Sequence, residues 1–151
     1  PCEIADLTSY DMICVTGGEP MLNVSRTLSI IRSIRDLRFR AGLDRQTIYL
    51  YTALFAEDAK WVLPWVDGIH FSLHDGADTP EIVGFHQMQD LLKGWSGSAR
   101  LYIDPRVKTL LSLEPPVWSR IEVKPWLEDG KCPLPEDDLL VLTERAEEEK
   151  A

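Results

Sequence analysis

The stretch that most constrains the fold is residues 12–22, Met-Ile-Cys-Val-Thr-Gly-Gly-Glu-Pro-Met-Leu. A short apolar run, typical of a buried strand, stops at Gly17-Gly18, and a carboxylate, a proline and a helical pattern follow. Two glycines let the backbone approach a ligand with its N–H and C=O groups exposed, and Pro20 stiffens the exit from the turn. Parallel α/β proteins bind ligands at such strand–turn–helix junctions.

The rest of the chain repeats this unit with short links. Apolar and β-branched runs predict strands over residues 10–16, 47–54, 67–73, 100–104 and 120–124. Helical patterns predict helices over residues 23–41, 56–63, 79–95 and 106–113. The alternation predicts an α/β fold with about five parallel strands and helical crossovers. Because a closed barrel needs eight such units, we expect an open or partial (β/α) barrel.

Local signals define the ends of the first long helix. Asn23 is a good N-cap, and Gly42 can end the helix as a C-cap. The helix carries several arginines, which we interpret as a solvated face rather than a binding patch. Residues 1–9 are expected to be a polar lead-in, too short to hold both a strand and a helix.

Length and charge limit the possible functions. A chain of 151 residues is expected to form one domain with a sizeable core. A formal net charge of −9 argues against a nucleic-acid partner, because phosphate-binding domains are usually basic. The acidic excess is concentrated near the end, so we divide the chain into a partial βα barrel over residues 1–135 and an acidic C-terminal segment over 136–151. Residues 138–145 fit either a helix or a strand.

Hydropathy and cysteine spacing give further limits. No run of 18 apolar residues and no signal-peptide pattern occurs, so we expect a soluble cytoplasmic protein with no membrane partner. Cys2, Cys14 and Cys132 are widely spaced and form no CxxC pair, which excludes a zinc ribbon and disfavours a disulfide framework. We predict no metal site. Cys14, in the middle of an apolar strand, is expected to be a small buried hydrophobic residue.

The run Thr16-Gly17-Gly18-Glu19-Pro20, with an apolar pair after it, resembles the GGEP motif of radical S-adenosylmethionine enzymes. In that family the motif closes the second barrel strand and binds the amino group of the cofactor's methionine moiety. The resemblance therefore implies S-adenosylmethionine as cofactor, with these five residues in its site and Glu19 as a ligand of the amine. The alternative is a tight βα turn without a ligand, in which Glu19 neutralises nearby arginines.

Two later strand ends extend the resemblance over residues 10–125. The family often has a Thr-Asn-Gly-like turn after its third strand, and Thr52 matches its first residue. Its fourth strand often ends in a Ser-Leu-Asp-Gly-like sequence near the cofactor's ribose, and residues 71–76 are similar with one residue inserted. The resemblance thus adds Thr52, Ser72 and His74 to the implied cofactor-binding residues.

The sequence departs from the family at the cluster. Members hold a 4Fe-4S cluster with a CxxxCxxC loop after the first strand, and no such triplet occurs here. A cluster is therefore expected only if a missing N-terminal segment supplies it. Without a cluster, no electron source exists to cleave S-adenosylmethionine reductively, so the chain alone is not expected to be a radical enzyme.

Other polar residues near the strand ends have either a structural or a ligand-binding role. His70 and His74 are four apart, but on a strand and its following loop they do not share a face, so they form no predicted metal pair. His74 faces the expected ligand mouth. Ser72 lacks the surrounding elbow of a hydrolase nucleophile. Asp104 either caps a turn or contacts a ligand, and the five tryptophans are expected to be core and interface residues.

Three functional hypotheses remain from the sequence. The preferred one is a truncated or degenerate radical S-adenosylmethionine-like domain that is not catalytically competent alone. The second is a non-enzymatic binding or regulatory domain that kept the scaffold, with a partner chain or a homodimer covering its exposed sheet edge. The third is an unrelated βα protein whose GGEP turn is a coincidence, and it predicts no affinity for the cofactor.

Overall fold

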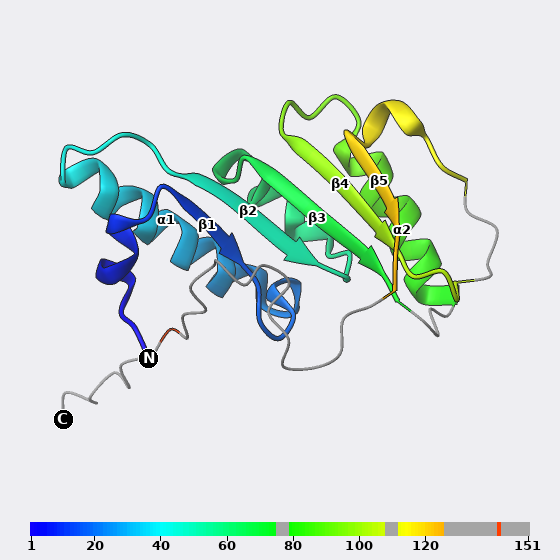
Figure 1. Cartoon of the computed structure of the whole chain (residues 1–151), viewed down its shortest axis with the longest axis horizontal. Coiled ribbons are helices and arrows are strands. Elements are labelled where there is room, and N and C mark those ends of the chain that lie inside the picture. The colour runs from blue at the N-terminus through cyan, green and yellow to red at the C-terminus, as the bar shows by residue number, and fades with distance from the viewer. Residues whose placement is uncertain (75–78, 108–111, 126–141, 143–151) are drawn as a thin grey trace.

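The computed structural model describes residues 1–74, 79–107, 112–125 and 142. It contains an all-parallel sheet in which the strands lie side by side in chain order (Figure 1). The strands are β1 Met12–Val15, β2 Thr47–Thr52, β3 Gly68–Leu73, β4 Ser98–Ile103 and β5 Arg120–Val123. The predicted α/β fold with five parallel strands is therefore confirmed. The sheet is open over the described residues, with β1 and β5 at its edges.

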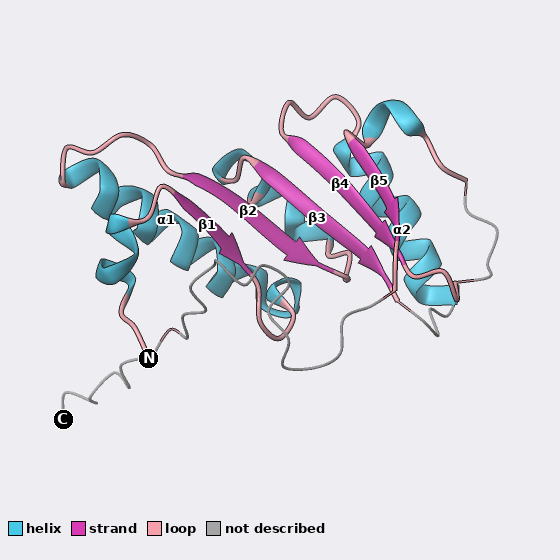
Figure 2. Ribbon diagram, in the orientation of Figure 1, coloured by secondary structure: helices cyan, strands magenta, loops and turns pink. Residues whose placement is uncertain are grey.

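Both long helices lie on the same side of the sheet, behind it in the view of Figures 1 and 2. They are α1 Val24–Arg40 and α2 Thr79–Leu92. Five short 3₁₀ helices accompany them in the described part of the chain: η1 Ile4–Ser9, η2 Pro20–Asn23, η3 Glu57–Trp61, η4 Leu63–Trp65 and η5 Pro115–Val117. The two faces of the sheet consequently differ, because only one of them is covered by α-helices.

Along the strands, side chains that face the helices alternate with side chains that face the uncovered side of the sheet. Residues on the helix-covered face, such as Ile48, Leu50 and Phe71, have almost no exposed surface. They pack with Ile31 and Ile34 of α1 in the hydrophobic core. Burial of each such side chain contributes about 1.5–3 kcal/mol to the free energy of unfolding. The residues between them point to the opposite face and are mostly polar or aromatic.

The ends of α1 agree with the sequence prediction. The Oδ1 atom of Asn23 accepts a hydrogen bond from the backbone N–H of Arg26 at 3.0 Å, as an N-cap does. Gly42 follows the helix with φ of 69°, the left-handed conformation that favours glycine. The interpretation of the helix arginines as a solvated face is wrong for Arg38, which is 7% exposed and bonds Asp11 at 2.8 Å.

Several other predictions need correction. The expected helix over residues 56–63 is two 3₁₀ helices, the second of which contains Pro64, because proline fits the first turn of a helix but not its interior. The lead-in over residues 1–9 contains η1, whose Leu7 is buried. The prediction that Cys14 is buried is wrong, since β1 is an edge strand and this side chain points to the uncovered face.

Two predictions fall mostly on residues that the structure leaves undescribed. The expected helix over residues 106–113 includes 108–111, which lie outside the described residues. The acidic segment over residues 136–151 also lies outside them, apart from Leu142, which forms a parallel β-bridge with Cys2. The alternatives of helix and strand for residues 138–145 therefore both stand.

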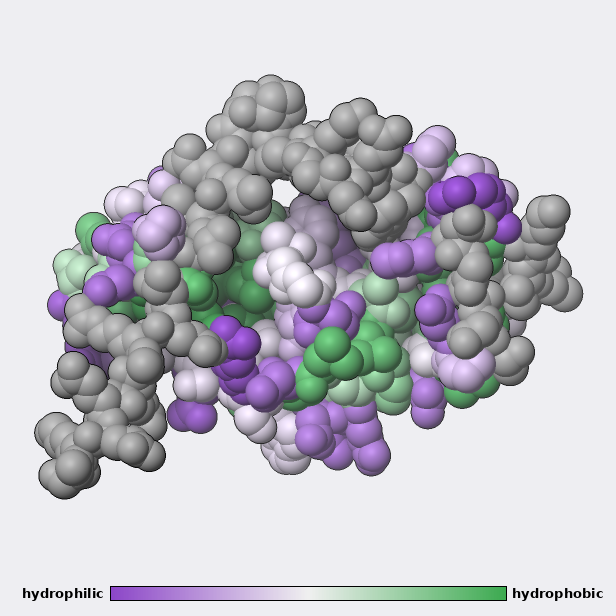
Figure 3. Space-filling view, turned by 90° about the horizontal axis from the view of Figure 1, so that it is seen from below, coloured by the Kyte–Doolittle hydropathy of each residue, from purple (hydrophilic) through white to green (hydrophobic). Residues whose placement is uncertain are grey.

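None of the helices in the described part of the chain is long and apolar enough to cross a membrane. Some large apolar side chains are nevertheless exposed, and Leu22 and Phe39 are the most exposed of them. Figure 3 shows apolar patches interspersed with polar ones over the described surface seen from below. Scattered exposed apolar residues are ordinary for a folded protein and do not by themselves define a docking face.

Candidate functional site

The glycine turn lies directly after β1, at the carboxyl end of the sheet. Gly17 and Gly18 have φ values of 86° and 60°, which other residues rarely adopt. Both are exposed, and a Cβ atom added to either would have no neighbour within 4 Å. No hydrogen bond within the described part of the chain engages their backbone N–H or C=O groups. The turn therefore presents free backbone donors and acceptors on an exposed surface.

Glu19 fixes this turn to the neighbouring strand. Its Oε2 atom accepts a hydrogen bond from the backbone N–H of Ala53 at 2.9 Å. Its Oε1 atom accepts from the hydroxyl of Thr52 and from the backbone N–H of Met21, the latter at 3.0 Å. Both carboxylate oxygens are thus engaged, and none of these partners is an arginine. Glu19 holds the end of β1 against the end of β2 and caps η2.

Thr52 and Pro20 support the same turn from the buried side. Thr52 is 5% exposed, and its hydroxyl accepts a hydrogen bond from the backbone N–H of Leu54 at 3.0 Å besides donating to Glu19. The carbonyl of Pro20 accepts from the hydroxyl of Thr27 in α1 at 2.7 Å. The structure therefore brings Thr52 to the GGEP turn, where its hydroxyl positions Glu19.

Ser72 and His74 lie farther along the sheet. Ser72 is in β3, on the face without helices, and His74 follows the strand as a half-buried residue. Because β2 separates β3 from β1, these two residues are not adjacent to the glycine turn. Thr16 lies beside it and is exposed. The predicted residues thus divide into one compact group around the turn and two positions at the end of β3.

Asp104 ends β4 at the same edge of the sheet. Its Oδ1 atom accepts hydrogen bonds from the backbone N–H of Arg106 at 2.8 Å and from the guanidinium Nε of that residue at 3.0 Å. This is the arrangement of a side chain that caps a turn. Of the two roles weighed for Asp104, the structure supports the turn cap.

A second group of residues, which the sequence analysis missed, lies on the sheet face without helices. Three tyrosine rings surround the imidazole of His70. Its ring centroid lies 4.1 Å from Tyr51, 5.3 Å from Tyr102 and 5.7 Å from Tyr49. We call these four residues the ring cluster. A Cβ atom at Gly68 would meet the Tyr49 ring at 2.3 Å, so a glycine there leaves room for that ring.

Basic side chains border the ring cluster on β4 and just beyond β5. The guanidinium of Arg100 lies 5.1 Å from the centre of the Tyr49 ring, and its Nη1 atom is 3.3 Å from Nε2 of His70. The ammonium of Lys124 lies 4.1 Å from the centre of the Tyr102 ring. Cations over aromatic faces are attracted by the ring quadrupole. The arrangement combines flat apolar surfaces with positive charge.

The protonation state of His70 follows from its surroundings. Burial, followed by the charges of Arg100 and Lys124, lowers the pKa of His70 to about 4. The imidazole is therefore neutral at pH 7. Because a guanidinium only donates, Nε2 must accept from Arg100, which assigns the ring hydrogen to Nδ1. This Nδ1 atom is buried, with no acceptor among the described residues.

Tyr51 and Cys14 form a contact at the edge of the ring cluster. The Cys14 thiol lies 3.9 Å from the Tyr51 hydroxyl, to which it is a weak donor. Burial of the phenol, with a smaller effect of Cys14, raises the pKa of Tyr51. The phenol is therefore protonated at neutral pH and adds no negative charge to this face.

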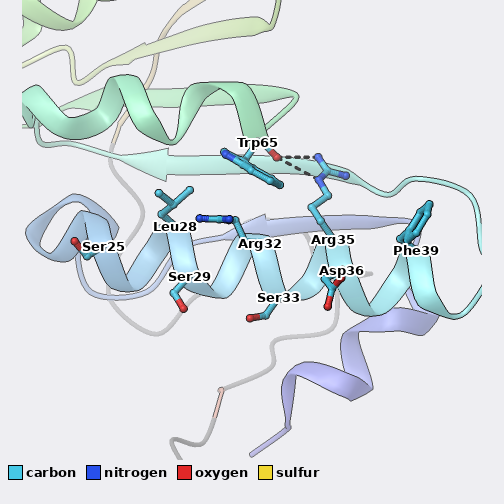
Figure 4. A pocket seen from close by; sticks show the side chains of 9 residues that line it. All are labelled: Ser25, Leu28, Ser29, Arg32, Ser33, Arg35, Asp36, Phe39 and Trp65. Carbon is cyan, nitrogen blue, oxygen red and sulfur yellow. Dashed lines mark hydrogen bonds between the residues drawn. The ribbon is translucent and has the colours of Figure 1, made fainter.

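A hollow lies on the opposite side of the molecule. It has a volume of about 700 Å³ and lies between the outer surface of α1 and Trp65 (Figure 4). The backbone carbonyl of Trp65 accepts from the guanidinium of Arg35 at 3.0 Å, and the Arg32 guanidinium lies 5.0 Å from the centre of its ring. The remaining lining residues are Ser25, Leu28, Ser29, Ser33, Asp36 and Phe39. This hollow is separate from both groups above.

A metal or cluster site is not formed by the described residues. No group of three potential His, Cys, Asp or Glu ligands occurs among them. Cys2 is buried beside Leu142, whereas Cys14 is exposed on β1. Cys132 lies outside the described residues. The thiols that the structure describes therefore do not fit a 4Fe-4S cluster, which needs several cysteines around one centre.

Comparison with known proteins adds no relative. The chain matches no family model, no curated protein and no solved structure. The chemistry of the two residue groups must therefore be argued from their geometry.

Proposed function

We propose that the chain is a radical S-adenosylmethionine-like domain that binds S-adenosylmethionine at its GGEP turn and is not catalytically competent alone. The observation that carries this proposal is the turn itself. Gly17 and Gly18 hold free backbone groups at the carboxyl end of β1, and Glu19 fixes them through three hydrogen bonds to neighbouring groups. A rigid turn binds a ligand without the entropic cost of ordering it.

The chemistry of the turn suits the methionine moiety of the cofactor. Free carbonyl groups can accept from an ammonium, and free N–H groups can donate to a carboxylate. An amino-acid ligand carries both groups on one carbon atom. The negative charge of Glu19 lies next to the turn and favours the ammonium over a neutral group. Within this proposal Glu19 is a positioning residue, and the backbone of the two glycines makes the contacts.

The proposal leaves reductive cleavage to another component. S-adenosylmethionine yields a radical only when an electron reaches it, and in the family that this chain resembles a 4Fe-4S cluster supplies the electron. The sequence contains no CxxxCxxC triplet. We therefore expect cofactor binding without turnover, unless a further segment of chain or a partner brings a cluster to the end of the sheet.

Isothermal titration of S-adenosylmethionine into the chain tests the proposal. The test variant is Gly18→Ala, with Gly94→Ala as the matched control. Both glycines have positive φ, and an added Cβ would meet nothing within 4 Å at either position. Each substitution should therefore cost about 1 kcal/mol of stability through backbone strain. Only Gly18→Ala should weaken binding, because the control lies after α2, away from the turn.

Two results would contradict the proposal. If the intact chain binds no S-adenosylmethionine at millimolar concentration, the turn is not a self-sufficient site. If Gly18→Ala and Gly94→Ala bind equally well, the cofactor site lies elsewhere.

A partner at the sheet edge is a second candidate, favoured by the exposure of β1. Met12 is 59% exposed, and the neighbouring Cys14 is also exposed. An exposed apolar strand at the edge of a sheet can pair with another chain. Light scattering would then give a mass above that of one chain, and Met12→Lys would reduce it. A monomer at all concentrations would contradict self-association through β1.

A further inference from the structure

Arg100 differs from the other partly buried arginines in its surroundings. On the other side of the sheet, Arg35 pairs with Asp67 and Arg38 pairs with Asp11, each at 2.8 Å. Arg100 forms no ion pair with a carboxylate of the described residues, and its polar contact is the neutral imidazole of His70. Charges that leave water are normally paired. The guanidinium is therefore a site at which an external anion would be stabilised.

The balance of charge on this face points the same way. Arg100 in β4, Arg120 at the start of β5 and Lys124 just after β5 accompany one carboxylate within these two strands, that of Glu122. Glu122 is already paired with Arg120, and its Oε2 atom lies 3.2 Å from the Lys124 ammonium. The hydrogen bond from Lys124, with the charges of Lys124, Arg120 and Arg100, lowers the pKa of Glu122. In a chain with a net charge of −9, this face is locally positive.

The ring cluster supplies the second half of a recognition surface. Tyr49, Tyr51 and Tyr102 are half-buried residues on this face. None of the described helices covers them, since α1 and α2 both lie behind the sheet (Figure 1). Aromatic faces bind planar rings by stacking, and a half-buried ring loses little conformational entropy when it does so. The surface thus suits a ligand that carries a planar ring next to a negatively charged group.

We propose that this face binds an organic anion whose carboxylate, sulfonate or phosphate group is attached to a planar ring. The anionic group would lie at Arg100, with Lys124 near it, and the ring against the tyrosines of the cluster. His70 positions the guanidinium by accepting its hydrogen bond. This inference does not rest on the S-adenosylmethionine proposal, because the two sites share no residue.

Three small probes separate the components of the proposed ligand. Benzenesulfonate carries a ring and a negative charge, benzyl alcohol carries the ring alone, and methanesulfonate carries the charge alone. Each is titrated into the full chain labelled with ¹⁵N, and the amide signals are followed by NMR. Benzenesulfonate should shift signals of β2, β3 and β4, and the other two should bind about tenfold more weakly.

Two variants and one control identify the cation. Arg100→Gln should weaken benzenesulfonate binding about tenfold, since it removes a charged hydrogen-bond donor. Lys124→Gln should weaken it about threefold, and this side chain is 52% exposed, so its replacement does not endanger the fold. The matched control is Lys60→Gln, whose ammonium lies 5.5 Å from the centre of the Trp61 ring in η3. It should leave the affinity unchanged.

The outcomes are distinct. The proposal is overturned if the three probes shift the same signals equally, if the shifts fall around α1 and Trp65, or if Lys124→Gln and Arg100→Gln bind as the unaltered chain does. If Arg100→Gln does not fold, Lys124→Gln and the probe comparison decide. The chain can bind benzenesulfonate without binding S-adenosylmethionine, and it can bind S-adenosylmethionine without binding benzenesulfonate. The failure of one proposal therefore leaves the other unaffected.

Discussion

Arg35 and Asp67 form a salt bridge of 2.8 Å that joins the middle of α1 to the residue before β3. Asp67 also accepts from the backbone N–H of Ile48 at 2.8 Å and pairs with Arg45 at 3.1 Å. One carboxylate thus connects a helix and two strands at the amino end of the sheet. Burial alone would raise the pKa of Asp67, but these partners hold it below its usual value.

Replacing Asp67 with asparagine should lower the free energy of unfolding by about 1–3 kcal/mol at pH 7, since several donors lose a charged acceptor. The control is Asp36→Asn, which breaks an exposed pair with Arg40 and should cost about 0.5 kcal/mol or less. Urea denaturation measures both. The pKa of Asp67 is lower in the folded chain than in the unfolded chain. The carboxylate therefore contributes to the free energy of unfolding at pH values above its unfolded-state pKa. This contribution is lost as the pH falls through its folded-state pKa. Equal stability of the two variants at pH 7 would contradict this role.

His70 should make the protein less stable in mild acid. Its pKa is about 4 in the folded chain. In the unfolded chain the pKa is about 6.5. The unfolded state therefore binds more protons between these values, and stability falls as the pH drops below the higher one. Between about pH 7 and pH 4.5 the unaltered chain should lose about 2 kcal/mol more than His70→Phe. An NMR titration of the imidazole with a midpoint near that of free histidine would contradict this account.

Glu19→Gln should loosen the GGEP turn. Glutamine keeps the size of the side chain but replaces one acceptor oxygen with a donor, so the backbone N–H groups of Met21 and Ala53, which bond different oxygens of Glu19, cannot both be satisfied. The expected loss is about 1–2 kcal/mol in the free energy of unfolding. Glu57→Gln, at an exposed position of η3, is the control and should change stability by less than about 0.5 kcal/mol. If Glu19→Gln leaves the free energy of unfolding unchanged, the turn does not need the carboxylate of Glu19.

Cys14 should react with N-ethylmaleimide in the native protein, whereas Cys2 should not. Cys14 is exposed, and Cys2 retains 7% of its surface. Peptide mapping by mass spectrometry after a short incubation distinguishes them. In urea both cysteines should be labelled. Protection of Cys14 in the native chain would show that its face of β1 is covered.

Much of the architecture could be predicted from the sequence. The predicted strand over residues 67–73 is observed as Gly68–Leu73, and the predicted helix over 23–41 as Val24–Arg40. These elements have strong local signals, an apolar run in the first case and a capped 3.6-residue period in the second. The family resemblance, by contrast, remains a prediction that rests on the GGEP turn.

The burial of Cys14 was predicted wrongly because a local pattern does not reveal which strand is an edge. An apolar run indicates a strand but does not show which other strands lie beside it in the sheet. In the structure, the order of the strands places β1 at an edge. The contacts of Glu19 were equally out of reach. Its partners Thr52, at the end of β2, and Ala53, just after it, follow Glu19 in the sequence by 33 and 34 residues.

The ring cluster has a signal in the sequence, which is the alternation of residues in β2 and β4. Residues 47–51 read Thr-Ile-Tyr-Leu-Tyr, with apolar residues at every second position, and residues 98–103 alternate in the same way. Strands of a parallel sheet covered on both faces are usually apolar throughout. When apolar residues alternate with other residues in the strands of a parallel sheet, the pattern indicates that helices cover one face of the sheet alone. It therefore predicts a second face with Tyr49, Tyr51 and Arg100 on it.

The presence of helices on one face also separates two kinds of evolutionary constraint. Leu50 and Tyr51 are neighbours in β2, yet the first packs in the core and the second lies on the uncovered face. Under the proposal that the uncovered face binds a ligand, a substitution at every second position of a strand would change what the protein recognises. The intervening positions, which pack in the core, would stay under constraint from folding alone.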